Sequence, residues 1–121
     1  IKSAVISNDS ACGIQKFINE NKIGESISCF WSSDNRPCKP DPQAVKELCK
    51  NLDLEPKHCA LIGDSNLDLQ MAKKAGIGII LGFMAGWKIS PDLKGYHHLI
   101  RHWNDLEIER NPKVANSSIS P

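Results

Sequence analysis

The chain has 121 residues, 40% of them hydrophobic, and its 15 basic and 14 acidic residues leave a formal net charge of +1. This size predicts one domain with a modest core, and because neither sign of charge forms a long run, we expect no nucleic-acid and no membrane partner. The five cysteines form no C-x-x-C pair, so we expect neither a disulfide framework nor a zinc site, and we expect a reducing, cytoplasmic location.

The first half of the chain alternates short apolar runs with helical patterns. Residues 3–6 predict a strand that stops at the polar residues 7–10. The helix predicted next has an apolar stripe of Ile14, Phe17 and Ile18. Residues 27–31 predict a second strand, followed by a polar loop at 32–39. Asp41-Pro42 then predicts a helix start, as N-cap and first-turn proline, ahead of an apolar stripe made of Val45, Leu48, Cys49 and Leu52.

The second half continues the alternation. Residues 59–62 predict a third strand, apolar on both faces, and residues 77–81 a fourth. The helix between them has an apolar side made of Leu67, Met71, Ala72 and Ala75, and it ends at Gly76. We expect a short strand at 98–100 and a helical turn at 103–106. Residues 1–106 are therefore interpreted as one α/β domain with a parallel sheet and helices on both faces, and residues 107–121 as a polar, disordered tail.

Three polar clusters fall where such a sheet places ligands, at the carboxyl ends of its strands. Ser7 and Asn8 follow the first strand, where a hydroxyl, an amide and backbone N–H groups suit a phosphate, although a helix N-cap uses the same residue types. Lys39 precedes two prolines that stiffen the backbone, although most lysines in polar loops are simply solvated.

Asp64 and Asp68 form the third cluster, directly after the third strand. The four-residue spacing puts both carboxylates on one side of a helix start, and carboxylate oxygens suit Mg²⁺. The alternative is that Asp64 or Ser65 caps the helix while Asp68 interacts with the positive end of its dipole.

The order and spacing of the clusters resemble a known family. Ser7 after a strand, Lys39 in "CKPDP", and both aspartates in "LIGDSNLDLQMAKKAG" resemble the second, third and fourth motifs of the haloacid dehalogenase superfamily, most closely its phosphoglycolate-phosphatase-like branch. The resemblance covers most of residues 3–82. It implies that Ser7 and Asn8 contact a transferring phosphoryl group and that Lys39 neutralises its charge. It further implies that Asp64 binds Mg²⁺, while Asp68 either joins through water or holds Lys39.

The first motif of that family, an Asp-x-Asp stretch that supplies the nucleophile, is absent from the chain. The family's sheet places the strand with this motif in its centre, between the first and third strands predicted here. We therefore expect upstream sequence or a partner chain to complete the sheet. We also expect the 121 residues alone to be inactive, and poorly soluble or oligomeric because their strand edges are open.

The resemblance implies a Mg²⁺-dependent phosphatase acting on a small phosphorylated metabolite such as phosphoglycolate, through an aspartyl-phosphate intermediate. Two alternatives stay open. One is a non-catalytic half-domain that binds phosphate and Mg²⁺ and pairs with a partner chain. The other is a related phosphomutase.

Overall fold

The computed structural model describes residues 1–87, 89 and 91–109. All the predicted strands are present, with ends shifted by one or two residues, and residues 110–121 of the predicted tail lie outside the described residues. In chain order the elements are β1 (Ala4–Ile6), α1 (Ala11–Glu20), β2 (Cys29–Trp31), α2 (Gln43–Leu52), a 3₁₀ helix (Pro56–His58), β3 (Ala60–Gly63), α3 (Asn66–Ala75), β4 (Ile79–Phe83), β5 (His98–Ile100) and a second 3₁₀ helix (Trp103–Asp105).

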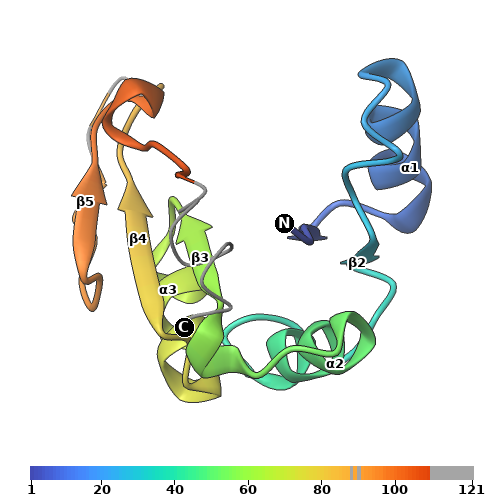
Figure 1. The fold of residues 1–121 in the computed structure, drawn as a ribbon, viewed down its shortest axis with the longest axis horizontal. Coiled ribbons are helices and arrows are strands. Elements are labelled where there is room, and N and C mark those ends of the chain that lie inside the picture. Colours follow the sequence, from blue (N-terminus) through green and yellow to red (C-terminus); the bar gives the residue numbers. More distant parts are fainter. Residues whose placement is uncertain (88, 90, 110–121) are drawn as a thin grey trace, which may run out of the picture.

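The strands form two separate parallel sheets, of order β1-β2 and β3-β4-β5. Figure 1 shows them on opposite sides of the molecule, with α2 lying between them at one end. In the described part of the chain no strand pairs β1 with β3, so each sheet keeps an open edge toward the other. This division agrees with the expectation that the chain lacks the strand at the centre of the sheet.

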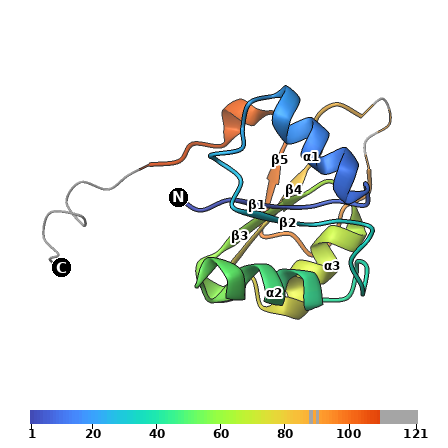
Figure 2. The same ribbon diagram turned by 90° about the vertical axis from the view of Figure 1, so that its right-hand side faces the viewer.

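Helices lie on both sides of the strand layer, as predicted. Figure 2 shows α1 on one side and α2 with α3 on the other. The core forms where α2 and α3 pack on β3 and β4, and Leu69 and Met71 are its largest fully buried side chains. Ile6 and Trp31 of the other sheet pack against the same core. The half of the chain that carries β1 and β2 is thus attached to the rest through apolar contacts.

Two apolar stripes differ from the prediction. Phe17 is 61% exposed, and α1 buries only Ile14 and Ile18, which are four residues apart and share one face. Leu67 is 44% exposed, because it lies in the first turn of α3 on the outer side, while the neighbouring Asp68 is buried instead. Periodicity located both helices correctly but assigned one residue of each to the wrong face.

One face of the larger sheet is left partly uncovered. Ile62 on β3 and Ile79 on β4 are 40% and 50% exposed, so β3 is apolar on both faces, as predicted, but is not covered on both. The physical reason is that α1, the helix on that side of the strand layer, lies beside β1 and β2 and not over β3 and β4 (Figure 1).

Within the described residues, no helix is both long and apolar enough to span a bilayer.

Candidate active site

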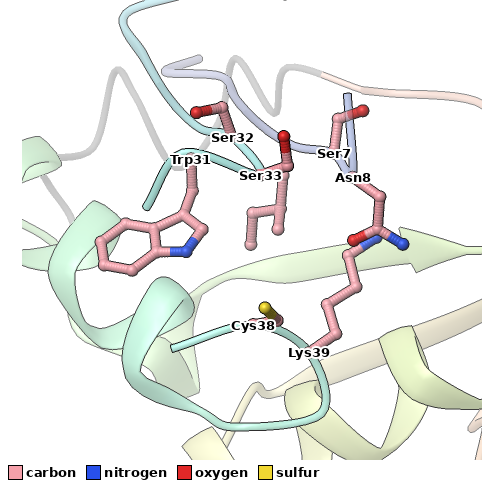
Figure 3. Close-up of a pocket in the computed structure, with 8 residues that line it drawn as sticks. Ser7, Asn8, Trp31, Ser32, Ser33, Cys38 and Lys39 are labelled. Carbon is pink, nitrogen blue, oxygen red and sulfur yellow. The ribbon is translucent and has the colours of Figure 1, made fainter. Parts of the chain in front are cut away.

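A hollow of about 270 Å³ lies at the carboxyl ends of β1 and β2, where the loops after the two strands meet the loop before α2. Figure 3 shows the side chains around it. Its lining residues are Ile6, Ser7, Asn8, Trp31, Ser32, Ser33, Cys38 and Lys39. The structure therefore brings together three of the predicted site residues, Ser7, Asn8 and Lys39, from segments more than thirty residues apart in the sequence.

Ser7 continues the β1–β2 ladder, because its N–H donates to the carbonyl of Trp31 at 3.0 Å. Its hydroxyl oxygen accepts a hydrogen bond from the N–H of Asp9 at 3.1 Å, which leaves the hydroxyl proton available to a ligand. Neither Ser7 nor Asn8 caps α1. The N-cap is Ser10, whose hydroxyl accepts from the Gly13 N–H at 3.0 Å, so the capping alternative for Ser7 and Asn8 is wrong.

The loop after β2 is fastened to the loop after β1. The Ser33 N–H donates to the carbonyl of Asp9 at 2.8 Å, and the Asp34 carboxylate accepts from the Ala11 N–H at 2.9 Å. Ser32 is 2% exposed, and both its N–H and its hydroxyl contact the Asn35 side-chain oxygen, at 2.9 and 3.1 Å. These bonds hold one wall of the hollow as a unit.

Lys39 is not a solvated loop lysine, because its side chain is only 12% exposed. Its Nζ lies 2.5 Å from Oδ1 of Asp68, whose side chain is 11% exposed. Figure 3 shows the Lys39 side chain extending toward Asn8 across the hollow. A hydrogen bond anchors the loop that carries Lys39 to the end of β2, since the Trp31 indole N–H donates to the carbonyl of Pro37 at 3.2 Å. The ammonium group is thus positioned between Asp68 and the hollow.

The junction between β3 and α3 places the two aspartates in different surroundings. Ser65 is the N-cap of α3, and its hydroxyl accepts from the Asp68 N–H at 3.3 Å. Asp68 packs against Gly63, where a Cβ atom would lie only 2.4 Å from the Asp68 Cβ. Asp64 is exposed and, among the described residues, makes no ion pair or side-chain hydrogen bond. The capping alternative therefore applies to Ser65, and the Asp64 carboxylate stays available.

Asp64 fits a hard cation better than Asp68 does. An unpaired, exposed carboxylate at the end of a strand is the kind of ligand that Mg²⁺ uses, often singly, with phosphate oxygens and water in its other positions. The Asp68 oxygen is already occupied by Lys39, which favours the second of its two predicted roles, that of holding the lysine. In the described part of the chain no three His, Cys, Asp or Glu side chains come together as a metal site.

Besides Ile6, sequence reasoning missed four residues that line the hollow, Trp31, Ser32, Ser33 and Cys38. They lie at the end of β2 and in the loop that carries no periodicity. The signal that could have located the first three is their position directly at the carboxyl end of a parallel strand, where ligands gather. Cys38 is the residue directly before Lys39, and both line the hollow (Figure 3).

Known proteins resemble this chain in sequence and in fold. The family model described as "Haloacid dehalogenase-like hydrolase" matches residues 1–81. Phosphoglycolate phosphatase 1 of Pseudomonas aeruginosa is 31% identical over 78 residues, covering 64% of this chain and 29% of that protein. The Pseudomonas putida phosphoglycolate phosphatase is 28% identical over 96 residues, covering 76% and 35%.

A solved HAD-superfamily hydrolase from Ehrlichia chaffeensis has the same fold, with a TM-score of 0.71 at 24% identity, covering 87% of this chain and 47% of that one. The chain spans about a third of the length of the two curated relatives. The match of the family model over two-thirds of the residues, together with the shared fold, decides the assignment: the chain belongs to the haloacid dehalogenase-like hydrolases.

Proposed function

We propose that these residues form one part of a Mg²⁺-dependent phosphatase that hydrolyses a small phosphorylated metabolite of the phosphoglycolate type. The observation that carries the proposal is the placement of Lys39, a nearly buried ammonium that is paired with Asp68 and lines the same hollow as Ser7 and Asn8. An ammonium, a hydroxyl and an amide around one hollow form a donor set suited to a phosphoryl group. The curated phosphoglycolate phosphatases among the relatives support this substrate class.

Each side chain has a distinct part in the proposed reaction. The Ser7 hydroxyl donates its free proton to a phosphoryl oxygen, and the Asn8 amide donates to a second one. Lys39 neutralises charge on the phosphoryl group as it transfers, and Asp68 keeps the ammonium in place. Asp64 holds the metal ion. When bound, Mg²⁺ supplies further neutralisation of the phosphoryl oxygens, the main requirement of phosphoryl transfer.

The proposed reaction needs a carboxylate nucleophile, which these 121 residues do not offer as an Asp-x-Asp stretch. We place it on a parallel strand between the open edges of β1 and β3, supplied by another part of the polypeptide or by a partner chain. The carboxyl end of such a strand lies between Ser7 and Asp64. Attack on phosphorus from this position forms the aspartyl phosphate as the bond from phosphorus to the ester oxygen of the metabolite breaks, and that oxygen leaves and takes up a proton. Water then cleaves the aspartyl phosphate, which releases inorganic phosphate and restores the carboxylate. We place the complete enzyme in the cytoplasm.

The missing nucleophile also favours a second candidate, a non-catalytic module that binds phosphate and a metal ion and pairs with another chain. The two candidates differ in one experiment. The chain is joined to, or mixed with, a segment that carries a strand ending in Asp-x-Asp, and phosphate release from phosphoglycolate is measured with and without Mg²⁺. Turnover that Lys39→Ala and Asp64→Asn each abolish supports the phosphatase. Strand binding without turnover refutes it and supports the module.

A further inference from the structure

A pair of thiols lies away from the hollow, between α2 and the start of β3. The Sγ atoms of Cys49 and Cys59 are 3.9 Å apart, and the structure describes both cysteines as free. Cys49 belongs to the second half of α2, whereas Cys59 is the residue before β3. The proposed reaction uses neither thiol. Cys49 lies toward the end of α2 that is remote from Lys39, and Cys59 lies at the end of β3 that is remote from Asp64.

The two thiols differ in access to solvent. Cys49 is 6% exposed and packs within the core, whereas Cys59 is only partly buried at its margin. Burial, with a smaller effect of the neighbouring Cys59 thiol, raises the pKa of Cys49 to about 11. A dissolved oxidant therefore reaches Cys59 first, and Cys49 is placed to react with it second.

We propose that Cys49 and Cys59 are a reversible redox modification site that forms an intramolecular disulfide by exchange with a low-molecular-weight disulfide. The Cys59 thiolate attacks one sulfur of the oxidant, and a mixed disulfide forms as the first small thiolate leaves. The Cys49 thiolate then attacks the Cys59 sulfur and expels the second. The two protein thiols are oxidised, one small disulfide is reduced to two thiols, and two protons leave the protein and are taken up by the released thiolates as pH allows.

The geometry needs only a small change for this bond. A disulfide requires the sulfurs to approach to about 2.05 Å, so the present separation closes by roughly 2 Å through rotation of the two side chains. Rotation of the Cys59 side chain gives up the hydrogen bond from its thiol to the Glu55 carbonyl, 3.3 Å. The third thiol of this region, Cys29 on β2, supplies an internal competitor for Cys49.

The test is disulfide mapping of the 121-residue chain in glutathione buffers of increasing oxidised fraction. After an acid quench and alkylation of remaining thiols, trypsin cuts after Lys46, Lys50, Lys57 and Lys73, which puts the two cysteines on separate peptides, 47–50 and 58–73. We expect these peptides to become linked, with an intact mass lower by about 2 Da for the two hydrogens lost. The linked peptides should exceed those from the chain oxidised in urea by about tenfold, since only the folded chain holds the thiols together.

Variants sharpen the result. Cys12→Ser, which removes an exposed thiol on α1, should leave the linkage unchanged. Cys49→Ser should trap Cys59 as its glutathione adduct, whereas Cys59→Ser should leave Cys49 largely unmodified. A link from Cys49 to Cys29, a stable glutathione adduct on Cys59 in the unmodified chain, or equal linkage in urea would overturn the proposal. None of these readouts depends on phosphatase activity, so the proposed function and the thiol site stand or fail separately.

Discussion

Replacing Gly63 with alanine should damage the site through its neighbour Asp68. A Cβ at position 63 lies 2.4 Å from Cβ of Asp68 and 2.9 Å from its Oδ2. Carbon atoms in contact prefer about 3.5–4.0 Å, so the two groups have to separate by roughly 1 Å or more. Hydrogen bonding of β3 to β4 and the Ser65 cap restrain the backbone on both sides. The Asp68 side chain therefore has to move, and its ion pair with Lys39 breaks.

The cost combines overpacking, about 1–3 kcal/mol, with the loss of a partner for a nearly buried charge. We expect Gly63→Ala to lower the free energy of unfolding by about 2–4 kcal/mol. Urea titration followed by tryptophan fluorescence measures this change. Gly24→Ala is the matched control, because its nearest neighbour would be a methyl group of Ile18 at an ordinary 3.8 Å.

A second readout follows Lys39 directly. Its amine is shielded in the native chain and should react with an acetylating reagent more slowly than the amines of exposed lysines such as Lys16. In Gly63→Ala that protection should fall, whereas in Gly24→Ala it should persist. If Gly63→Ala keeps both the urea midpoint and the Lys39 protection of the parent chain, the argument that Gly63 positions Asp68 is refuted.

Three further predictions concern the Lys39–Asp68 ion pair, the Asp64 carboxylate and the Cys49 thiol. Lys39→Met and Asp68→Asn should each lower the free energy of unfolding. The double variant should lower it by less than the sum of the two, with a coupling energy of about 1–3 kcal/mol in a double-mutant cycle measured by urea unfolding. Strict additivity would contradict the pairing. Asp64→Asn should leave the urea midpoint unchanged, because the carboxylate is exposed, yet remove Mg²⁺-dependent turnover from a protein that contains the nucleophile strand. The raised pKa of Cys49, about 11 against 9.0, means that the unfolded chain loses this proton first. Stability should thus be fully present below pH 9 and fall toward pH 11, and Cys49→Ala should flatten that slope in unfolding curves; equal slopes would contradict the assignment.

The elements of the fold could be predicted because each depends on local signals. Strand runs bounded by polar residues and the left-handed Gly76, with φ of 81°, marked most element ends. The exposure of Phe17 and Ile62 could not be predicted, because periodicity shows which residues share a face and not whether another element covers that face. The alternation of strands and helices predicted helices over both faces of the sheet, but α1 lies beside β1 and β2 and leaves one face of β3 and β4 partly uncovered (Figure 1).

The candidate site, like the fold, could be predicted only in part from the sequence. Ser7 and Asn8 follow the end of a strand, and Lys39 precedes the start of a helix, and the fold brings these element boundaries together around one hollow. The sequence does not show whether Asp68 joins a metal site through water or holds Lys39. The folded structure bears on this choice, because it places the Asp68 oxygen beside Lys39 and the Asp68 Cβ against Gly63. Trp31 at the end of β2 and Cys38 beside Lys39 were not assigned to the site, because residue spacing does not show which neighbours of a site residue line a hollow.

The division into two sheets has a thermodynamic consequence. Ser7 and Asn8 directly follow β1 of the smaller sheet, while Asp64 and Asp68 follow β3 of the larger one, so the distance across the site depends on how the two halves are held. A strand that pairs with both open edges fixes that distance before a phosphorylated ligand arrives. By reciprocity, a ligand that contacts both halves tightens the binding of the strand by the same factor. The gain in substrate affinity when the strand is bound and the gain in strand affinity when the substrate is bound therefore measure the same coupling free energy.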